Sequence, residues 1–179
     1  MPKNRWDVIA NIILLNDYKM IAEVGASRGD TARGIIRCLD SLNFRLNRYY
    51  LIDLPDNRKD FAYHFNPEFL KGRKEPRTIF KASLEAVEDF QDNSLDLVFL
   101  DADHSEAAFV PDIKAWMKKL RVGGTLCGDE YLAPPPHSCA YRTSILDRMF
   151  GEVHHQEETR LSEGYLTHMW WVKKRTHET

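Results

Sequence analysis

The 179-residue sequence has few cysteines and no CxxC pair. Its three cysteines, Cys38, Cys127 and Cys139, are an odd number, which argues against a disulfide framework and against a cysteine zinc site. A reducing, cytoplasmic location is therefore expected. The longest apolar stretch near the N-terminus, Ile12 to Leu15, is too short to span a bilayer, and no signal-peptide pattern is recognisable.

The sequence also lacks an excess of charge of either sign. Its 25 basic and 27 acidic residues give a net charge of −2 at pH 7, so there is no electrostatic case for a nucleic-acid partner. No internal repeat or low-complexity tract stands out. With 43% hydrophobic residues, the chain is expected to form a single domain over residues 1–179.

Short apolar runs alternate with longer amphipathic stretches, which is typical of βαβ units around a parallel sheet. The predicted strands and helices, in chain order, are a helix over 6–15, a strand over 20–24, a helix over 31–42, strands over 49–52 and 78–80, a short helix capped by Ser83, a strand over 95–100, a helix over 109–120 with Pro111 in its first turn, a strand over 125–127 and a helix over 144–150. Two more runs, 153–155 and 168–172, are expected to pair as antiparallel strands at one sheet edge, before a solvated tail at 173–175. The predicted fold class is α/β, a mainly parallel sheet with helices on both faces.

The segment from Glu23 to Gly29 reads E-x-G-x-x-x-G between a predicted strand and a predicted helix. Gly25 permits a tight turn, and the loop presents backbone N–H groups near a helix N-terminus, where polar or anionic ligand groups bind. Asp53 ends the second predicted strand, where a carboxylate can accept both hydroxyls of a ribose. The loop alone also suits an ordinary strand–helix turn. Together with Asp53 it indicates a nucleoside-cofactor site.

On these residues the sequence resembles the class I S-adenosylmethionine-dependent methyltransferases. The stretch from Asp96 to Ser105 looks like the D-L-V-F-I-D-G-D-H-S segment of one subfamily of small methyltransferases. The stretch from Leu120 to Thr125 is similar to the L-x-P-G-G motif before strand five, with Val122 in place of proline. The resemblance covers about residues 20 to 131. It implies a Rossmann-like fold and S-adenosylmethionine as the cofactor.

The resemblance also implies which residues contact the cofactor. The glycine loop would lie along the methionine part, Asp53 would hold the ribose, and Ser83 and Leu84 would border the adenine. Glu23 would orient the amino group or the loop. The full set of expected cofactor-binding residues is Glu23, Gly25, Ala26, Ser27, Gly29, Thr31, Asp53, Ser83, Leu84 and Asp101.

The segment 101–104, Asp-Ala-Asp-His, follows a predicted central strand at the end where α/β sheets bind ligands. It resembles the D-A-D-K segment of metal-dependent catechol- and caffeoyl-type O-methyltransferases. That resemblance implies that Asp101, Asp129 and Glu130 hold Mg²⁺ or another divalent cation through oxygen ligands. It also implies that Asp101 and His104 are catalytic, with His104 as the general base in place of lysine. Without a metal, Asp101 and Asp103 would position the cofactor and His104 would form hydrogen bonds.

The sequence therefore predicts an S-adenosylmethionine-dependent methyltransferase that acts on a small molecule, at a hydroxyl oxygen. The proline-rich loop 131–142 would lie over the acceptor or serve as a rigid surface connection. One alternative function is metal-free methylation of a sugar or natural-product precursor. Another is a cofactor-binding module that needs a partner protein or has lost catalysis. The acceptor and the oligomeric state, for which a homodimer is one option, stay open.

Overall fold

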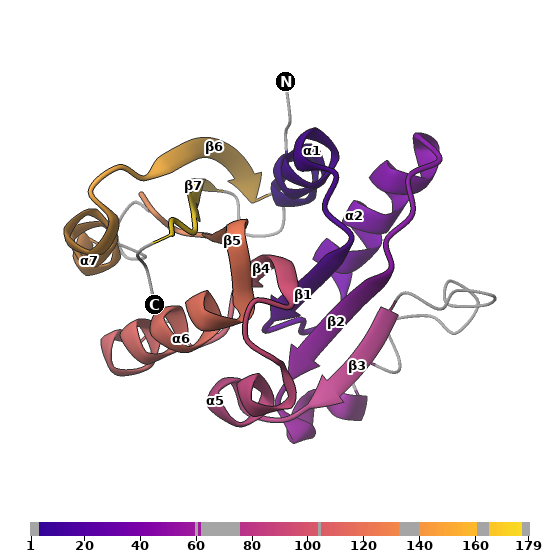
Figure 1. The fold of residues 1–179 in the computed structure, drawn as a ribbon, viewed down its shortest axis with the longest axis horizontal. Helices are drawn as coiled ribbons and strands as arrows, with labels where there is room; N and C mark the ends of the chain where they lie inside the picture. The colour runs from indigo at the N-terminus through magenta and orange to yellow at the C-terminus, as the bar shows by residue number, and fades with distance from the viewer. Residues whose placement is uncertain are drawn as a thin grey trace.

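The computed structural model describes residues 4–59, 61, 76–103, 105–132, 140–160 and 165–176. Helices and strands alternate over the first part of the chain, and two long strands follow near its C-terminus (Figure 1). The elements are α1 (Arg5–Asn16), β1 (Met20–Val24), α2 (Asp30–Ser41), β2 (Arg48–Asp53), the 3-10 turn η1 (Pro55–Asn57), β3 (Pro76–Phe80), α5 (Ser83–Ala86), the 3-10 turn η2 (Val87–Asp89), β4 (Leu95–Leu100), α6 (Glu106–Lys119), β5 (Leu120–Gly128), α7 (Ala140–Phe150), β6 (His154–Arg160) and β7 (Tyr165–Lys173).

The described strands form one seven-stranded sheet in the order β3-β2-β1-β4-β5-β7-β6. Neighbours from β3 to β5 pair in parallel, and β7 pairs antiparallel with both β5 and β6. This confirms the predicted fold class, including the antiparallel pair at one edge. From β1 the chain runs outward to β2 and β3 and then returns to β4. The carboxyl ends of β1 and β4 therefore flank a topological switch point, where open α/β sheets place their ligands.

Helices cover both faces of the sheet, as the sequence predicts. Figure 1 shows α1 and α2 on one side and α5, α6 and α7 on the other. Strand β4 serves both sides, because successive side chains of a strand point to opposite faces. Leu97 and Phe99 belong to the core beneath α1 and α2, whereas Val98 and Leu100 belong to the core beneath α6 and α7. An almost entirely apolar strand, in which Asp96 is the exception, is the expected result of burial on both faces.

Helix α1 is fixed at its start and along its side. Asn4 and Asp7 form a capping box, in which the Asn4 backbone N–H donates to Asp7 Oδ2 at 3.2 Å. On the flank, α2 brings Gly34 against Trp6, where an added Cβ would lie only 2.3 Å from Trp6 Cγ. This close approach holds α1, and with it Arg5, above the end of the sheet.

The prediction that Pro111 lies in the first turn of its helix was wrong. Helix α6 begins at Glu106, and Pro111 lies inside it. The start is set by Ser105, whose hydroxyl accepts the Ala108 N–H at 3.3 Å and so satisfies one of the unpaired N–H groups of the first turn. A good N-cap residue therefore outweighs the preference of proline for the first turn.

Three other predicted boundaries also differ. Helix α5 has Ala82, not Ser83, at its N-cap position, and α2 begins after Gly29, whose φ is +74°. Strand β5 starts at Leu120, well before the predicted start at residue 125, because the strand continues through Gly123 and Gly124. An added Cβ at Gly124 would lie 2.9 Å from Asp96 O, so this glycine lets β5 approach β4 where the register shifts.

The C-terminal segment 173–175 is not a solvated tail throughout. Lys173 ends β7, and Lys174 is buried at 7% exposure. The Lys174 ammonium donates to Asn93 Oδ1 at 3.0 Å and to the carbonyl of Leu120 at 2.8 Å, so it closes the junction between α6 and β5. Burial of the lysine is possible because these acceptors replace water.

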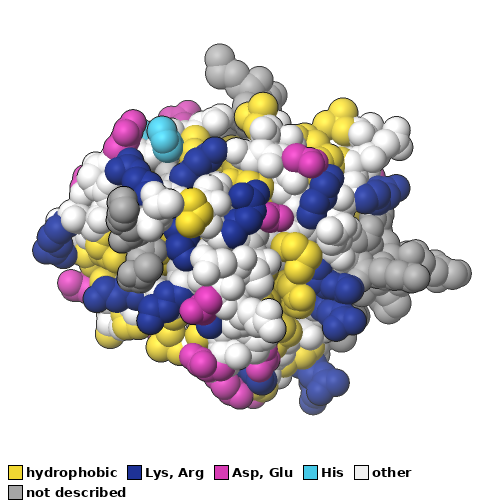
Figure 2. Space-filling model, in the orientation of Figure 1, with side chains coloured by type: hydrophobic (Ala, Val, Ile, Leu, Met, Phe, Trp, Pro, Cys, Tyr) yellow, Lys and Arg dark blue, Asp and Glu magenta, His cyan; other side chains and the backbone are white. Residues whose placement is uncertain are grey.

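The surface agrees with the near-neutral composition. In Figure 2, Lys and Arg side chains are spread over the visible face and are separated by neutral, hydrophobic and acidic groups. No helix in the described part of the chain is both long and apolar enough to cross a membrane.

Candidate active site

The glycine loop joins the carboxyl ends of three strands. The backbone N–H groups of Gly25 and Ala26 both donate to the Ile52 carbonyl, at 2.9 and 3.0 Å, which ties the loop to β2. Gly25 has a φ of +90°, and an added Cβ would lie 1.9 Å from the Asp101 carbonyl oxygen, after β4. Only glycine fits between these strands, which agrees with the prediction that Gly25 permits a tight turn here.

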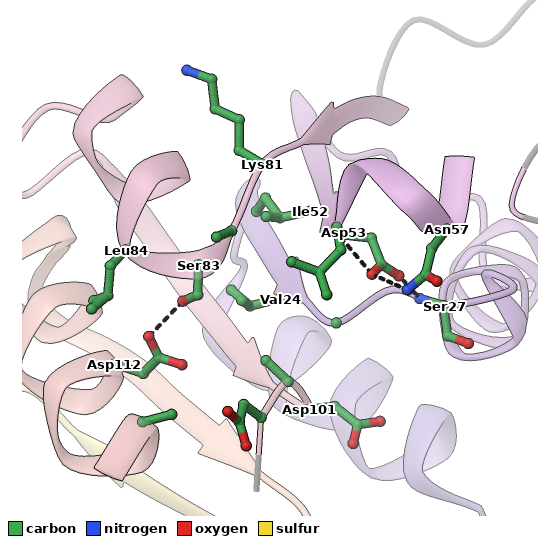
Figure 3. Close-up of a pocket in the computed structure, with 16 residues that line it drawn as sticks. Val24, Ser27, Ile52, Asp53, Asn57, Lys81, Ser83, Leu84, Asp101 and Asp112 are labelled. Carbon is green, nitrogen blue, oxygen red and sulfur yellow. Dashed lines mark hydrogen bonds between the residues drawn. The ribbon is translucent and has the colours of Figure 1, made fainter. Parts of the chain in front are cut away.

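Asp53 lies at the end of β2 and is fixed by three donors. Its Oδ2 accepts the Ser27 backbone N–H, and its Oδ1 accepts the Leu54 N–H and the Asn57 amide, both at 2.7 Å (Figure 3). Ser27 itself has a φ of +46°, a left-handed conformation that turns its N–H toward the carboxylate. The glycine loop and the acidic residue that were predicted to act together are therefore joined by a hydrogen bond.

A cavity of about 540 Å³ opens at this edge of the sheet. Its size lies in the usual range for small-molecule and cofactor sites. The lining comes from the ends of β1, β2 and β4 and the segments that follow them, from η1, from α5 and the residues before it, and from the first half of α6: Val24, Gly25, Ser27, Ile52, Asp53, Leu54, Asn57, Lys81, Ala82, Ser83, Leu84, Asp101, Ala102, Asp103, Ala108 and Asp112.

The cavity has two polar sides with apolar side chains between them. In Figure 3, Asp53, Asn57 and Ser27 lie on one side, Ser83 and Asp112 lie on the other, and Val24 and Ile52 lie between. Such a cavity suits an elongated ligand with a flat apolar part and hydroxyl or amide groups along its length.

Most of the predicted cofactor residues are brought together here, but not all of them. Gly25, Ser27, Asp53, Ser83, Leu84 and Asp101 line the cavity. The lining does not include Glu23, Ala26, Gly29 or Thr31. Gly29 caps α2 and its N–H donates to the Ala26 carbonyl at 2.7 Å, so these two support the loop from behind.

Asp112 is a polar residue of the cavity that the sequence did not single out. It is 5% exposed, and its Oδ1 accepts the Ser83 hydroxyl at 2.6 Å. The Ser83 oxygen in turn accepts the Trp116 indole N–H at 2.9 Å. Burial raises the pKa of Asp112, while the Ser83 hydrogen bond acts in the opposite direction. Its only sequence signal is an acidic residue on the apolar face of a helix, which helical spacing alone does not distinguish from a surface carboxylate.

Glu23 is buried behind the loop. Its side chain points to the α1 side of the sheet, where it accepts the Tyr49 hydroxyl hydrogen. Burial raises the pKa of Glu23 to about 8, against the lowering effect of the Tyr49 hydrogen bond and with a further increase from the charge of Asp101. A neutral carboxyl group at this position suits a role in holding the loop.

The three predicted metal ligands each face an arginine. The Arg5 guanidinium donates to Asp101 Oδ2 and lies 3.6 Å from Asp129 Oδ2. Glu130 points elsewhere and pairs with Arg142 of α7 at 2.9 Å. Among the described residues, no group of three or more His, Cys, Asp or Glu side chains is arranged to hold a metal ion. The residues present therefore do not fit the metal site that the resemblance implies.

His104, predicted as the general base, and residues 133–139 of the proline-rich loop lie outside the described residues. Tyr131, at the start of that loop, donates its hydroxyl hydrogen to Asp147 of α7 at 2.6 Å, and burial raises the pKa of Tyr131 to about 12.

The model of a methyltransferase domain family matches residues 22–131. No curated protein matches the chain. Cofactor-bound Rv0187 from MTB is 13% identical with a TM-score of 0.72, and the alignment covers 96% of this chain and 80% of that one.

Two solved O-methyltransferases are similarly close. The enzyme from Bacillus cereus, in complex with SAH, is 15% identical with a TM-score of 0.67, over 95% of this chain and 80% of its own. TomG from Streptomyces achromogenes, in complex with SAM, is 14% identical with a TM-score of 0.68, over 95% and 79% of the two chains. At these identities the likeness shows a shared fold, and it confirms the predicted Rossmann-like architecture.

Proposed function

Because the chain belongs to the methyltransferase family matched over residues 22–131, we propose that it transfers the methyl group of S-adenosylmethionine to a hydroxyl oxygen of a small molecule. The observation that carries the cofactor assignment is the hydrogen bond between the Ser27 N–H of the glycine loop and the Asp53 carboxylate beside the cavity. The choice of oxygen is supported by the structural neighbours, two of which are O-methyltransferases with SAH or SAM bound.

In this proposal the cavity binds the cofactor through residues of both its polar sides. Asp53 accepts the ribose hydroxyls, since three N–H donors hold its carboxylate at the cavity wall. Ser83 and Leu84 border the adenine, and Gly25 and Ser27 line the methionine part. The remaining predicted residues support the glycine loop from behind the lining: Glu23, Ala26, Gly29 and Thr31.

S-adenosylmethionine, when bound, supplies a methyl group on a sulfonium sulfur. The chain contributes alignment, because displacement in line requires the acceptor oxygen to approach from the side opposite the sulfur. Asp101 and Asp103 follow β4 at the cavity edge, and the Asp101 N–H donates to the Val24 carbonyl at 2.8 Å. The acidic segment is thereby anchored to the strand that leads into the glycine loop.

Proton removal from the acceptor by His104 remains a prediction from the resemblance. Metal assistance by Asp101, Asp129 and Glu130 is likewise a prediction from the resemblance. It is not part of the proposed function because arginines face all three carboxylates. A cofactor-binding module without catalysis is the alternative, and it differs from an enzyme only in turnover.

The test of the cofactor assignment is a calorimetric titration with SAH of the wild type and of Asp53→Asn. The substitution keeps the shape of the side chain but replaces an acceptor oxygen by a donor. Loss of hydrogen bonds to a charged group costs about 1.5–3 kcal/mol, so SAH affinity should fall by about 10- to 150-fold. Asp56→Asn, at an exposed position three residues further on, is the matched control and should bind like the wild type.

Unchanged SAH binding by a folded Asp53→Asn protein would contradict the assignment. Near-UV circular dichroism of both variants shows whether the loop and core remain ordered. A screen for SAH release in the presence of hydroxylated metabolites then separates the enzyme from the binding module, since only the enzyme produces SAH from S-adenosylmethionine.

A further inference from the structure

The Arg5 guanidinium lies between two of the three residues predicted to bind a metal ion. One of its nitrogens, Nη1, contacts both Asp101 Oδ2 and, at 3.6 Å, Asp129 Oδ2. We propose that Arg5 takes the place of the divalent cation, so that methyl transfer by this protein needs no metal ion. The role in the reaction rests on the proposed function, whereas the arrangement of charges can be tested by cation binding alone.

The two carboxylates require a positive partner because water has little access to them. The side chain of Asp129 is 1% exposed, that of Asp101 is 19% exposed, and that of Arg5 is 14% exposed. Charges removed from water are tolerated in proteins when a counter-charge replaces the lost hydration. The guanidinium supplies this counter-charge through an N–H donated to Asp101 and through its positive charge 3.6 Å from Asp129 Oδ2, where a metal ion would supply it by direct coordination. Because the Arg5 guanidinium and a metal ion are both positively charged, only one of them can lie between the two carboxylates.

The third predicted ligand is held away from this pair. Glu130 has a φ of +56° and directs its carboxylate to Arg142, at 2.9 Å. Arg142 is only 3% exposed, and its guanidinium also lies over the ring of Phe109, at 5.8 Å from the centroid. If Glu130 turned to a metal ion, it would leave a buried guanidinium without this carboxylate, which is strongly unfavourable. Without Glu130, a cation at this edge would have only the Asp101 and Asp129 carboxylates as protein ligands, and with Arg5 between them it would also meet a like charge.

Arg5 therefore acts as a positioning residue for the acidic edge of the cavity. It fixes the Asp101 carboxylate from the side of α1, and the capping box and the Gly34–Trp6 contact fix α1 itself. Arginine stays protonated at any working pH, so the positive charge is present regardless of the concentration of free cations. The enzyme should accordingly be active in rigorously chelated buffer.

The experiment measures Mn²⁺ binding by electron paramagnetic resonance, with Mg²⁺ as competitor, on the full chain with SAH. The wild type should bind no Mn²⁺ at this site. Arg5→Gln removes the charge and leaves Asp101 and Asp129 facing each other, so it should gain a Mn²⁺ site about tenfold or more tighter than any binding by the wild type. A purely structural arginine would produce no such gain. Arg5→Lys, which keeps the charge, should not gain the site.

Arg121→Gln is the matched control, since Arg121 pairs with Asp96 at the opposite end of β4. Its removal uncovers a single carboxylate that two backbone N–H groups already hold, at 2.7 and 2.8 Å, and should create no Mn²⁺ site. Mn²⁺ uptake by the wild type that Asp101→Asn abolishes would overturn the proposal. So would a folded Arg5→Gln protein that binds no Mn²⁺, because the two carboxylates would then not form a cation position.

If Arg5→Gln does not fold, the wild type decides the question through its own Mn²⁺ titration and through Asp101→Asn. Failure of the proposed function is distinguishable from failure of this inference, because it would appear as absent SAH binding in the same samples. Turnover in the presence of EDTA is the additional readout for the reaction, and it should equal turnover without EDTA.

Discussion

Replacing Gly25 with alanine should displace the glycine loop from the sheet, and it should lower both the free energy of unfolding and the affinity for SAH. Two costs add at this position. A non-glycine residue at a φ of +90° loses about 1–3 kcal/mol. The new Cβ would also lie 1.9 Å from Asp101 O and 2.9 Å from Ala102 Cα, so two backbone segments must separate. Forced overpacking costs about 1–3 kcal/mol more, which gives about 2–6 kcal/mol in total.

Gly151→Ala separates the two costs. Gly151 also has a positive φ, +72°, but an added Cβ there would meet no atom within 4 Å. It therefore carries the conformational cost without the clash, and it should lower the free energy of unfolding by about 1–3 kcal/mol. The difference between the two variants measures the close approach of the loop to the segment after β4.

Urea denaturation followed by tryptophan fluorescence gives both free energies of unfolding by linear extrapolation. Trp116 and Trp170 are fully buried and so report on loss of the core. A Gly25→Ala protein as stable as Gly151→Ala, with unchanged SAH affinity, would refute the steric reasoning, because the backbone clash would then have no consequence for the site.

Two more predictions concern buried ionisable groups. Lys174→Met should lower the free energy of unfolding by about 1–3 kcal/mol in urea denaturation, because carbonyls at the α6–β5 junction lose their donor; Lys173→Met, nearer the surface, is the control and should change it by less than about 0.5 kcal/mol. For Glu23, burial raises the pKa from 4.5 to about 8, so the folded chain keeps a proton that the unfolded chain releases. Wild-type stability should therefore fall relative to Glu23→Gln as the pH rises from about 5 to 8, by at most about 1.4 kcal/mol per pH unit. A difference between the two proteins that is independent of pH would contradict the buried, protonated carboxyl.

The backbone-made part of the site could be predicted from the sequence because its signals are local. A glycine after an apolar run predicts a strand that ends in a tight turn, and Gly25 occupies that position with a positive φ. An acidic residue at the end of the next strand predicts a carboxylate at the same edge, and Asp53 is bonded to Ser27 there. Each step needs only strand period, strand order and the geometry of parallel sheets.

The parts that were mispredicted depend on contacts between distant segments. Pro111 is inside α6 because the cap at Ser105 starts the helix earlier. Lys174 is buried because Asn93 and the end of α6 supply acceptors, which nothing in its sequence neighbourhood indicates. Asp112 belongs to the cavity through Ser83, which a helical pattern of apolar residues does not reveal. In each case a tertiary partner decides a local preference.

The acidic edge of the cavity shows which additional feature separates a metal site from an arginine-bridged one. The order of strands brings Asp101 and Asp129 together, and two carboxylates with little access to water need a positive partner. That partner is either a dissolved cation or a basic side chain from an element that covers the same edge. Helix α1 covers it, and the first residue of α1 is Arg5. The acidic motifs after the fourth and fifth strands therefore do not by themselves imply a metal. The decisive residue stands 96 positions earlier than Asp101, at the start of a helix whose closeness to the motif becomes evident only when α1 is placed above the sheet.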